Sequence, residues 1–96
     1  MDEKSKKLMD RPVEEDTKII VEKLVNFGEF TALYEKWYWE GVTASSIICL
    51  EEDARKFGEE KLVEYIFKMM QLPVDPQYTY STKNGYVYVN FGFDAG

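Results

Sequence analysis

The sequence predicts a small α+β domain in which helices cover one face of an antiparallel sheet. Three observations lead to this prediction. Apolar residues recur at helical spacing in residues 12–27 and 51–72, aromatic and β-branched residues crowd residues 30–50, and an Asn-Gly pair joins two alternating segments near the C-terminus. The expected order is helix, hairpin, helix, hairpin, or αββαββ. A chain of 96 residues has room for one hydrophobic core, so we expect a single domain over residues 12–96.

The first regular element is expected to be a helix that follows a tail. Residues 1–11 are rich in charge and show no apolar period, so we expect them to be a flexible charged tail. Asp10 suits a helix cap, and Pro12 suits the first turn of a helix over residues 12–27. The acidic residues that follow favour the positive end of the helix dipole. One buried stripe would contain Val13, Ile20, Leu24 and Phe27.

The aromatic run over residues 30–39 fits two structures. In a helix, Trp37 would lie on the apolar face and Trp39 would point away from it. In a strand, Trp37 and Trp39 would share one face and Tyr38 would lie on the other. We favour the strand, because the nine residues after Glu40-Gly41 are apolar and β-branched, and this pair can turn the chain between two antiparallel strands.

The second half of the chain predicts a helical region and a hairpin. Residues 51–72 begin with acidic residues and carry an apolar stripe, with a break at Gly58 and an end before Pro73. Asn84-Gly85 is the preferred pair for a type I′ turn, and alternation on both sides of it predicts a β-hairpin. Pairing outward from the turn places Tyr78, Tyr80, Thr82, Val87, Val89 and Phe91 on the core face, and Ser81, Tyr86, Tyr88 and Asn90 on the outer face.

The charge of the chain limits its partners. It has 18 acidic and 12 basic residues and a formal net charge of −6. Nucleic-acid binding depends on clustered Lys and Arg, so we expect no direct binding to DNA or RNA. An aromatic sheet face can stack the bases of single-stranded RNA, but only Lys83 lies beyond residue 68 to hold the backbone. The charge favours a protein partner with a basic surface, although it also suits a protein that simply stays in solution.

No segment suggests a membrane or secreted protein. No apolar run approaches the roughly 18 residues of a membrane span, and the first ten residues have no apolar region behind their charges. Cys49 is the only cysteine, so no disulfide can form within the chain. We therefore expect a cytoplasmic protein that does not bind membranes.

The residues that usually carry catalysis are missing or have a simpler explanation. The chain has no histidine, so Ser-His and Cys-His pairs cannot form. Cys49 lies in an apolar run typical of an inert core thiol, and Ser45-Ser46 lacks a Gly-x-Ser-x-Gly context. The acidic residues 51–53 could bind a hard cation but also suit a helix start. We expect no enzyme activity, no metal and no cofactor, with a small metal-dependent enzyme as the least favoured alternative.

The run Glu35–Gly41, with the sequence EKWYWEG, is the best candidate for a binding surface. Neither a helix nor a strand hides all three rings behind one covered face, and exposed Trp and Tyr are enriched at binding hot spots. The candidate partner-binding residues come from this run and from the outer face of the second hairpin: Glu35, Trp37, Tyr38, Trp39, Glu40, Tyr86 and Tyr88. The alternative is that these rings are ordinary core.

These expectations favour a small, acidic, non-catalytic interaction protein. An inhibitor or immunity-type protein that docks on the basic surface of a nucleic-acid-handling protein has these properties, and a phage anti-defence or anti-CRISPR-like inhibitor is one example of the class. The alternative is a homo-oligomeric structural or accessory subunit, such as a homodimer in which the same aromatic residues pair across a two-fold axis.

Overall fold

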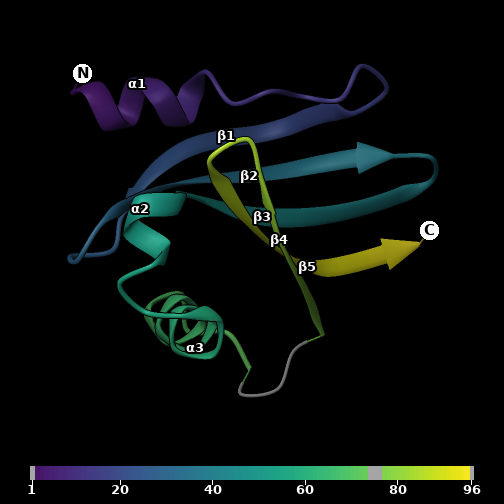
Figure 1. Cartoon of the computed structure of the whole chain (residues 1–96). Coiled ribbons are helices and arrows are strands. Elements are labelled where there is room, and N and C mark those ends of the chain that lie inside the picture. The colour runs from purple at the N-terminus through teal and green to yellow at the C-terminus, as the bar shows by residue number, and fades with distance from the viewer. Residues whose placement is uncertain (1, 74–76, 96) are drawn as a thin grey trace.

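The computed structural model describes residues 2–73 and 77–95 of the chain. Its strands and short helices confirm the α+β class that the sequence predicts. Five antiparallel strands form one sheet in the order β1-β2-β3-β5-β4, and helices lie on both of its faces (Figure 1). The element order is αβββααββ rather than the expected αββαββ. In chain order the elements are α1 Glu3–Met9, β1 Lys18–Asn26, β2 Thr31–Trp39, β3 Val42–Leu50, α2 Glu51–Ala54, α3 Glu59–Met69, β4 Tyr78–Lys83 and β5 Tyr86–Ala95.

The helix expected over residues 12–27 is wrong, because most of that stretch forms strand β1. Three consecutive β-branched residues, Ile19, Ile20 and Val21, lose side-chain freedom in a helix and pack well on a sheet. The register of β1 with β2 shifts between Ile19 and Val21. The extra residue of this bulge interrupts the strict alternation of the strand and so weakens its signal in the sequence. Val13 and Ile20, expected in a buried stripe, are both exposed.

Residues 3–9, expected to belong to a charged tail, form the helix α1. The Asp2 side chain accepts a hydrogen bond from the amide of Ser5 at 2.7 Å and caps the helix. Leu8 is fully buried against a group of apolar side chains that includes Leu33 and Ile48. These residues are therefore a helix packed on the sheet, and the expectation that helices cover one face only is wrong. Residue 1 of the expected tail lies outside the described residues.

The two hairpins that the sequence predicts are confirmed. Both turns have positive φ at their two central residues, as a type I′ turn requires: 44° and 82° at Glu40 and Gly41, and 54° and 85° at Asn84 and Gly85. The register of the second hairpin also agrees with the prediction, since Tyr78 pairs with Phe91, Tyr80 with Val89 and Thr82 with Val87. The break at Gly58 is confirmed as the point that separates α2 from α3.

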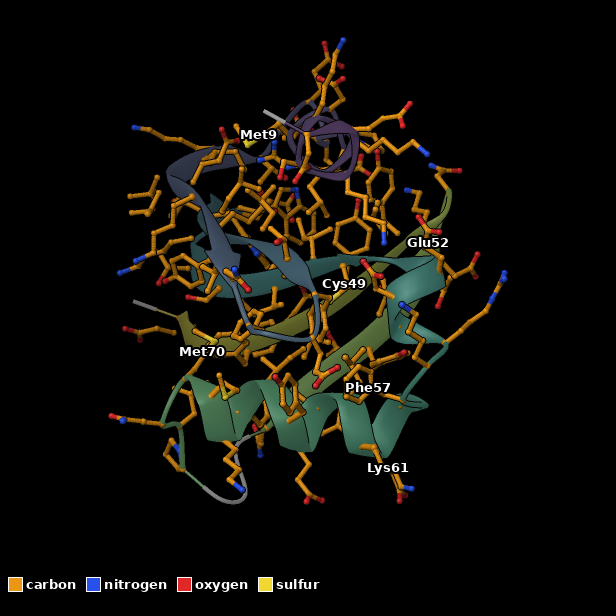
Figure 2. All side chains as sticks on the ribbon, turned by 90° about the vertical axis from the view of Figure 1, so that its left-hand side faces the viewer. Met9, Cys49, Glu52, Phe57, Lys61 and Met70 are labelled. Atoms are coloured by element: carbon orange, nitrogen blue, oxygen red, sulfur yellow. The ribbon has the colours of Figure 1, made fainter. Side chains whose placement is uncertain are left out.

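The main core lies between the sheet and α3. Figure 2 shows Cys49 on the sheet between α1 and α3, with Phe57 and Met70 beside α3. Fully buried side chains of this core include Ile47, Cys49, Leu62, Ile66 and Val89. On the opposite face, α1 covers a smaller core of Leu8, Leu33, Ile48 and Leu50. The rest of that face carries polar and aromatic side chains together with Ile19 and Ala44. In the part of the chain that the structure describes, no helix is long and apolar enough to cross a membrane.

Candidate functional site

A cleft of about 610 Å³ lies on the sheet face that carries α1. The segment between α1 and β1, residues 10–17, runs along the strands toward the sheet end where β2 turns into β3 (Figure 1). This segment forms a wall of the cleft through Pro12–Glu15 and Thr17, and Ser81 and Lys83 of β4 add to the lining. Six side chains from three strands form the floor: Glu35, Trp37, Trp39, Ser46, Tyr88 and Asn90. We call this site the aromatic cleft.

Strand alternation and register bring the floor of the aromatic cleft together. Side chains two positions apart on a strand share a face, so Glu35, Trp37 and Trp39 of β2 lie on one side of the sheet. Glu35 pairs with Ser46 of β3, and Ser46 pairs in turn with Asn90 of β5. The backbone hydrogen bonds of the sheet therefore fix the relative positions of these residues.

A chain of side-chain hydrogen bonds crosses the floor. Nε1 of Trp37 donates to Oγ of Ser46 at 2.7 Å, and this hydroxyl donates to Oδ1 of Asn90 at 2.6 Å. Nδ2 of Asn90 then donates to Oγ1 of Thr79 at 3.0 Å. The chain joins β2, β3, β5 and β4 and leaves the indole of Trp37 with little freedom to rotate. A ligand would meet the ring of Trp37, because its N–H is already bonded.

The two indoles keep their ring faces free of other aromatic groups. Trp37 is half-buried, whereas 42% of Trp39 is exposed. None of the aromatic pairs among the described residues includes either indole. Tryptophan offers a large area and an electron-rich face, so an exposed indole in a cleft is suited to anchor a ligand.

A buried ion pair attaches residues 10–17 to the sheet. Nη2 of Arg11 donates to Oε2 of Glu35 at 2.7 Å and to Oε2 of Glu22, and Nη1 donates to the carbonyl of Met9 at 3.0 Å. Only 6% of Arg11 and 7% of Glu35 are exposed. Burial lowers the pKa of Arg11, but the hydrogen bonds and the charges of Glu35 and Glu22 together raise it, and the net pKa lies above the ordinary value. Arg11 is therefore charged and holds the wall of the cleft in place.

The open end of the aromatic cleft is acidic and partly apolar. Its lining has three carboxylates, Glu14, Glu15 and Glu35, and one ammonium group, Lys83. Lys83 forms an exposed ion pair with Glu14 at 3.2 Å, whereas Glu15 forms no ion pair with any residue that the structure describes. Asp16 and Glu40 add exposed carboxylates at the sheet end where β2 turns into β3, and Val13, Trp39 and Phe93 are exposed apolar side chains there. We call this region the acidic end.

The structure brings together four of the seven residues proposed for partner binding. Glu35, Trp37, Trp39 and Tyr88 line the aromatic cleft, and Glu40 lies next to it in the β2–β3 turn. Tyr86 shares the same face but lies farther along β5, where its hydroxyl donates to the carbonyl of Lys7 in α1 at 2.7 Å. Tyr38 is exposed on the opposite face of the sheet.

Sequence reasoning missed Arg11 and the role of Ser46. Ser46 is 1% exposed in the central strand, and a serine within an apolar, β-branched run is a signal of a buried polar contact. Arg11 gives no such signal, because its partners lie 11 and 24 residues away in the chain. The wall of the cleft depends on this long-range contact.

The groups considered for catalysis serve the fold. Burial raises the pKa of the Cys49 thiol to about 12, so the nucleophilic thiolate is scarce near neutral pH. Asp53, one of the acidic residues at the start of α2, is buried and pairs with Lys4 at 3.1 Å and Lys56 at 3.8 Å. Residues 2–73 and 77–95 contain no group of three or more potential ligands that could hold a metal ion. The arrangement of the aromatic cleft is suited to binding.

Comparison with known proteins gives no relative: no protein-family model, curated protein or solved structure matches the chain.

Proposed function

We propose that this protein is a non-catalytic binding protein that docks on a basic surface of another protein through the aromatic cleft and the acidic end. The observation that carries the proposal is Trp39, an exposed indole without an aromatic neighbour among the described residues, in a cleft lined by carboxylates. In protein interfaces, truncation of a buried aromatic anchor costs more binding free energy than truncation of most other contact residues. Carboxylates around such an anchor attract a basic partner and repel an acidic one.

The charge of the whole chain supports the same partner class. A net charge of −6 accelerates encounter with a basic surface and opposes contact with phosphates. Proteins that handle nucleic acid carry basic surfaces because they neutralise phosphates with Lys and Arg. An inhibitor or immunity-type protein that covers such a surface in the cytoplasm is the function that this site fits best.

An unbiased selection tests the proposal. The protein is immobilised and used to select from a displayed library of random peptides, first as the wild type and then as Trp39→Ala and Tyr38→Ala. These two residues are adjacent in sequence and nearly equal in exposure, at 42% and 41%, but they lie on opposite faces of the sheet. We expect the wild type to enrich peptides rich in Arg and Lys, Trp39→Ala to lose this enrichment, and Tyr38→Ala to keep it.

Two results would overturn the proposal. Enrichment of neutral or acidic peptides, or equal losses in the two variants, would show that the acidic, aromatic face does not select the partner. A molar mass of twice 11.3 kDa for the wild type, together with a monomeric Trp39→Ala variant, would assign the anchor to a homodimer instead.

A further inference from the structure

We infer that the aromatic cleft receives a guanidinium group, namely an arginine side chain of the basic partner. This inference rests on the proposed function and names the group that the site recognises. Three features carry it: two indoles without an aromatic or cationic partner among the described residues, a carboxylate without an ion pair there, and an arginine of the chain itself bound at the cleft floor.

The two indoles provide surfaces for a flat cation. Trp37 and Trp39 are two positions apart on β2, which separates their Cα atoms by about 6.6 Å along the strand. Both line the aromatic cleft, and neither contacts another aromatic ring in the described part of the chain. The only cation–π contact among the described residues is that of Lys23 with Tyr34, so no described cation of the chain occupies either indole.

The carboxylates provide the charge. Glu15 is exposed on the wall of the cleft and has no ion-pair partner among the described residues. Glu14 pairs with Lys83, but both side chains are exposed, and exposed pairs are weak enough to exchange partners. An incoming cation therefore finds one free carboxylate and a second that Lys83 can release. An anionic ligand would meet the uncompensated charge of Glu15.

The chain already binds a guanidinium group at this floor. Arg11 lies between Glu22 and Glu35, and Glu35 lines the aromatic cleft beside Trp37. A guanidinium group presents five donors in one plane, and it is less strongly hydrated than an ammonium group, so it can stack on an indole while it bonds a carboxylate. Arginine is thus favoured over lysine as the inserted side chain.

Titration of small blocked amino acids tests the inference. The chain has two tryptophans, and both line the cleft, so its two indole N–H signals in an NMR spectrum report directly on the site. The probes are N-acetyl-arginine methylamide, the lysine analogue, and the citrulline analogue, which has nearly the shape of arginine but no charge. We expect the arginine probe to shift the Trp39 signal most, the lysine probe to bind more weakly, and the citrulline probe to give no shift at the same concentration.

A matched pair of variants separates the cleft from the general charge of the protein. Glu15→Gln should bind the arginine probe about threefold more weakly, as expected for the loss of one partly exposed ion pair. Glu64→Gln removes an exposed carboxylate of α3, which packs on the other face of the sheet, and should leave the affinity unchanged. Equal losses in the two variants would overturn the inference, because they would show that only the net charge matters.

The failure of this inference can be told apart from the failure of the proposed function. Equal shifts with the arginine and citrulline probes would mean that the cleft takes a neutral polar group, and no shift with either would mean that it takes neither. Both results overturn the arginine site. If the selected peptides still depend on Trp39 but tolerate replacement of each arginine by citrulline, the basic docking surface stands without an arginine site.

Discussion

Replacement of Arg11 by methionine should destabilise the protein more than a typical substitution in a segment without regular secondary structure. The substitution leaves Glu22 and Glu35, which are direct cross-strand partners, without a cation between them. Loss of one partner from a buried ion pair typically costs 3–5 kcal/mol. The Glu35 side chain is only 9% exposed but that of Glu22 is 31% exposed, so we expect the lower end of this range, about 3 kcal/mol.

Urea unfolding followed by tryptophan fluorescence measures this loss, and a double-mutant cycle assigns it to the pair. Arg11→Met with Glu35→Leu removes both buried charges, so the double variant should recover most of the stability, with a coupling free energy of about 2 kcal/mol. Arg55→Ala is the control: its side chain is 73% exposed and pairs with Glu51, so its loss should be about 0.5 kcal/mol. If Arg11→Met costs no more than Arg55→Ala, or if the double variant simply adds the two losses, the ion pair does not attach residues 10–17 to the sheet.

Three further predictions concern the fold. Gly85→Val should lower the free energy of unfolding by about 1–2 kcal/mol, because a β-branched residue is strained at the φ of 85° that the turn requires. An unchanged urea midpoint would contradict the type I′ turn. Leu8→Ala should cost about 2–5 kcal/mol in the same assay, because the side chain is fully buried under α1, whereas a residue in a free tail would cost nothing. Cys49 should resist a thiol reagent at about pH 8.5 until urea unfolds the chain, because burial raises its pKa from 9.0 to about 12, and rapid labelling of the native protein would contradict this burial. Because the thiol ionises at lower pH in the unfolded chain than in the folded one, it should also reduce the stability of the protein as pH rises from 9 toward 12.

The hairpins could be predicted from the sequence because their signals are local. Asn84-Gly85 defines a turn, and alternation on either side then fixes which side chains share a face. β1 could not be predicted in the same way, because the bulge near Ile20 breaks the alternation that indicates a strand. α1 could not be predicted, because seven residues with Leu8 as the main buried apolar group show no period.

The aromatic cleft could be predicted only in part. The strand interpretation of residues 30–39 correctly placed Trp37 and Trp39 on one face and Tyr38 on the other, and the hairpin register placed Tyr88 on an outer face. The wall of the cleft could not be inferred, because it depends on the contact of Arg11 with two strands. No local pattern encodes a contact between residues so distant in the chain.

The most direct test of the account is the affinity of a selected basic peptide for the wild type and for Trp39→Ala. Calorimetry measures this affinity at about 50 mM and about 500 mM salt, because charges are screened over very different distances at these two concentrations. We predict that affinity for the wild type falls as salt rises, and that Trp39→Ala loses about 2 kcal/mol or more of binding free energy at both salt concentrations. Its stability loss should stay well below the roughly 3–5 kcal/mol of a fully buried ring. Affinity that changes with neither salt nor Trp39 would contradict the account.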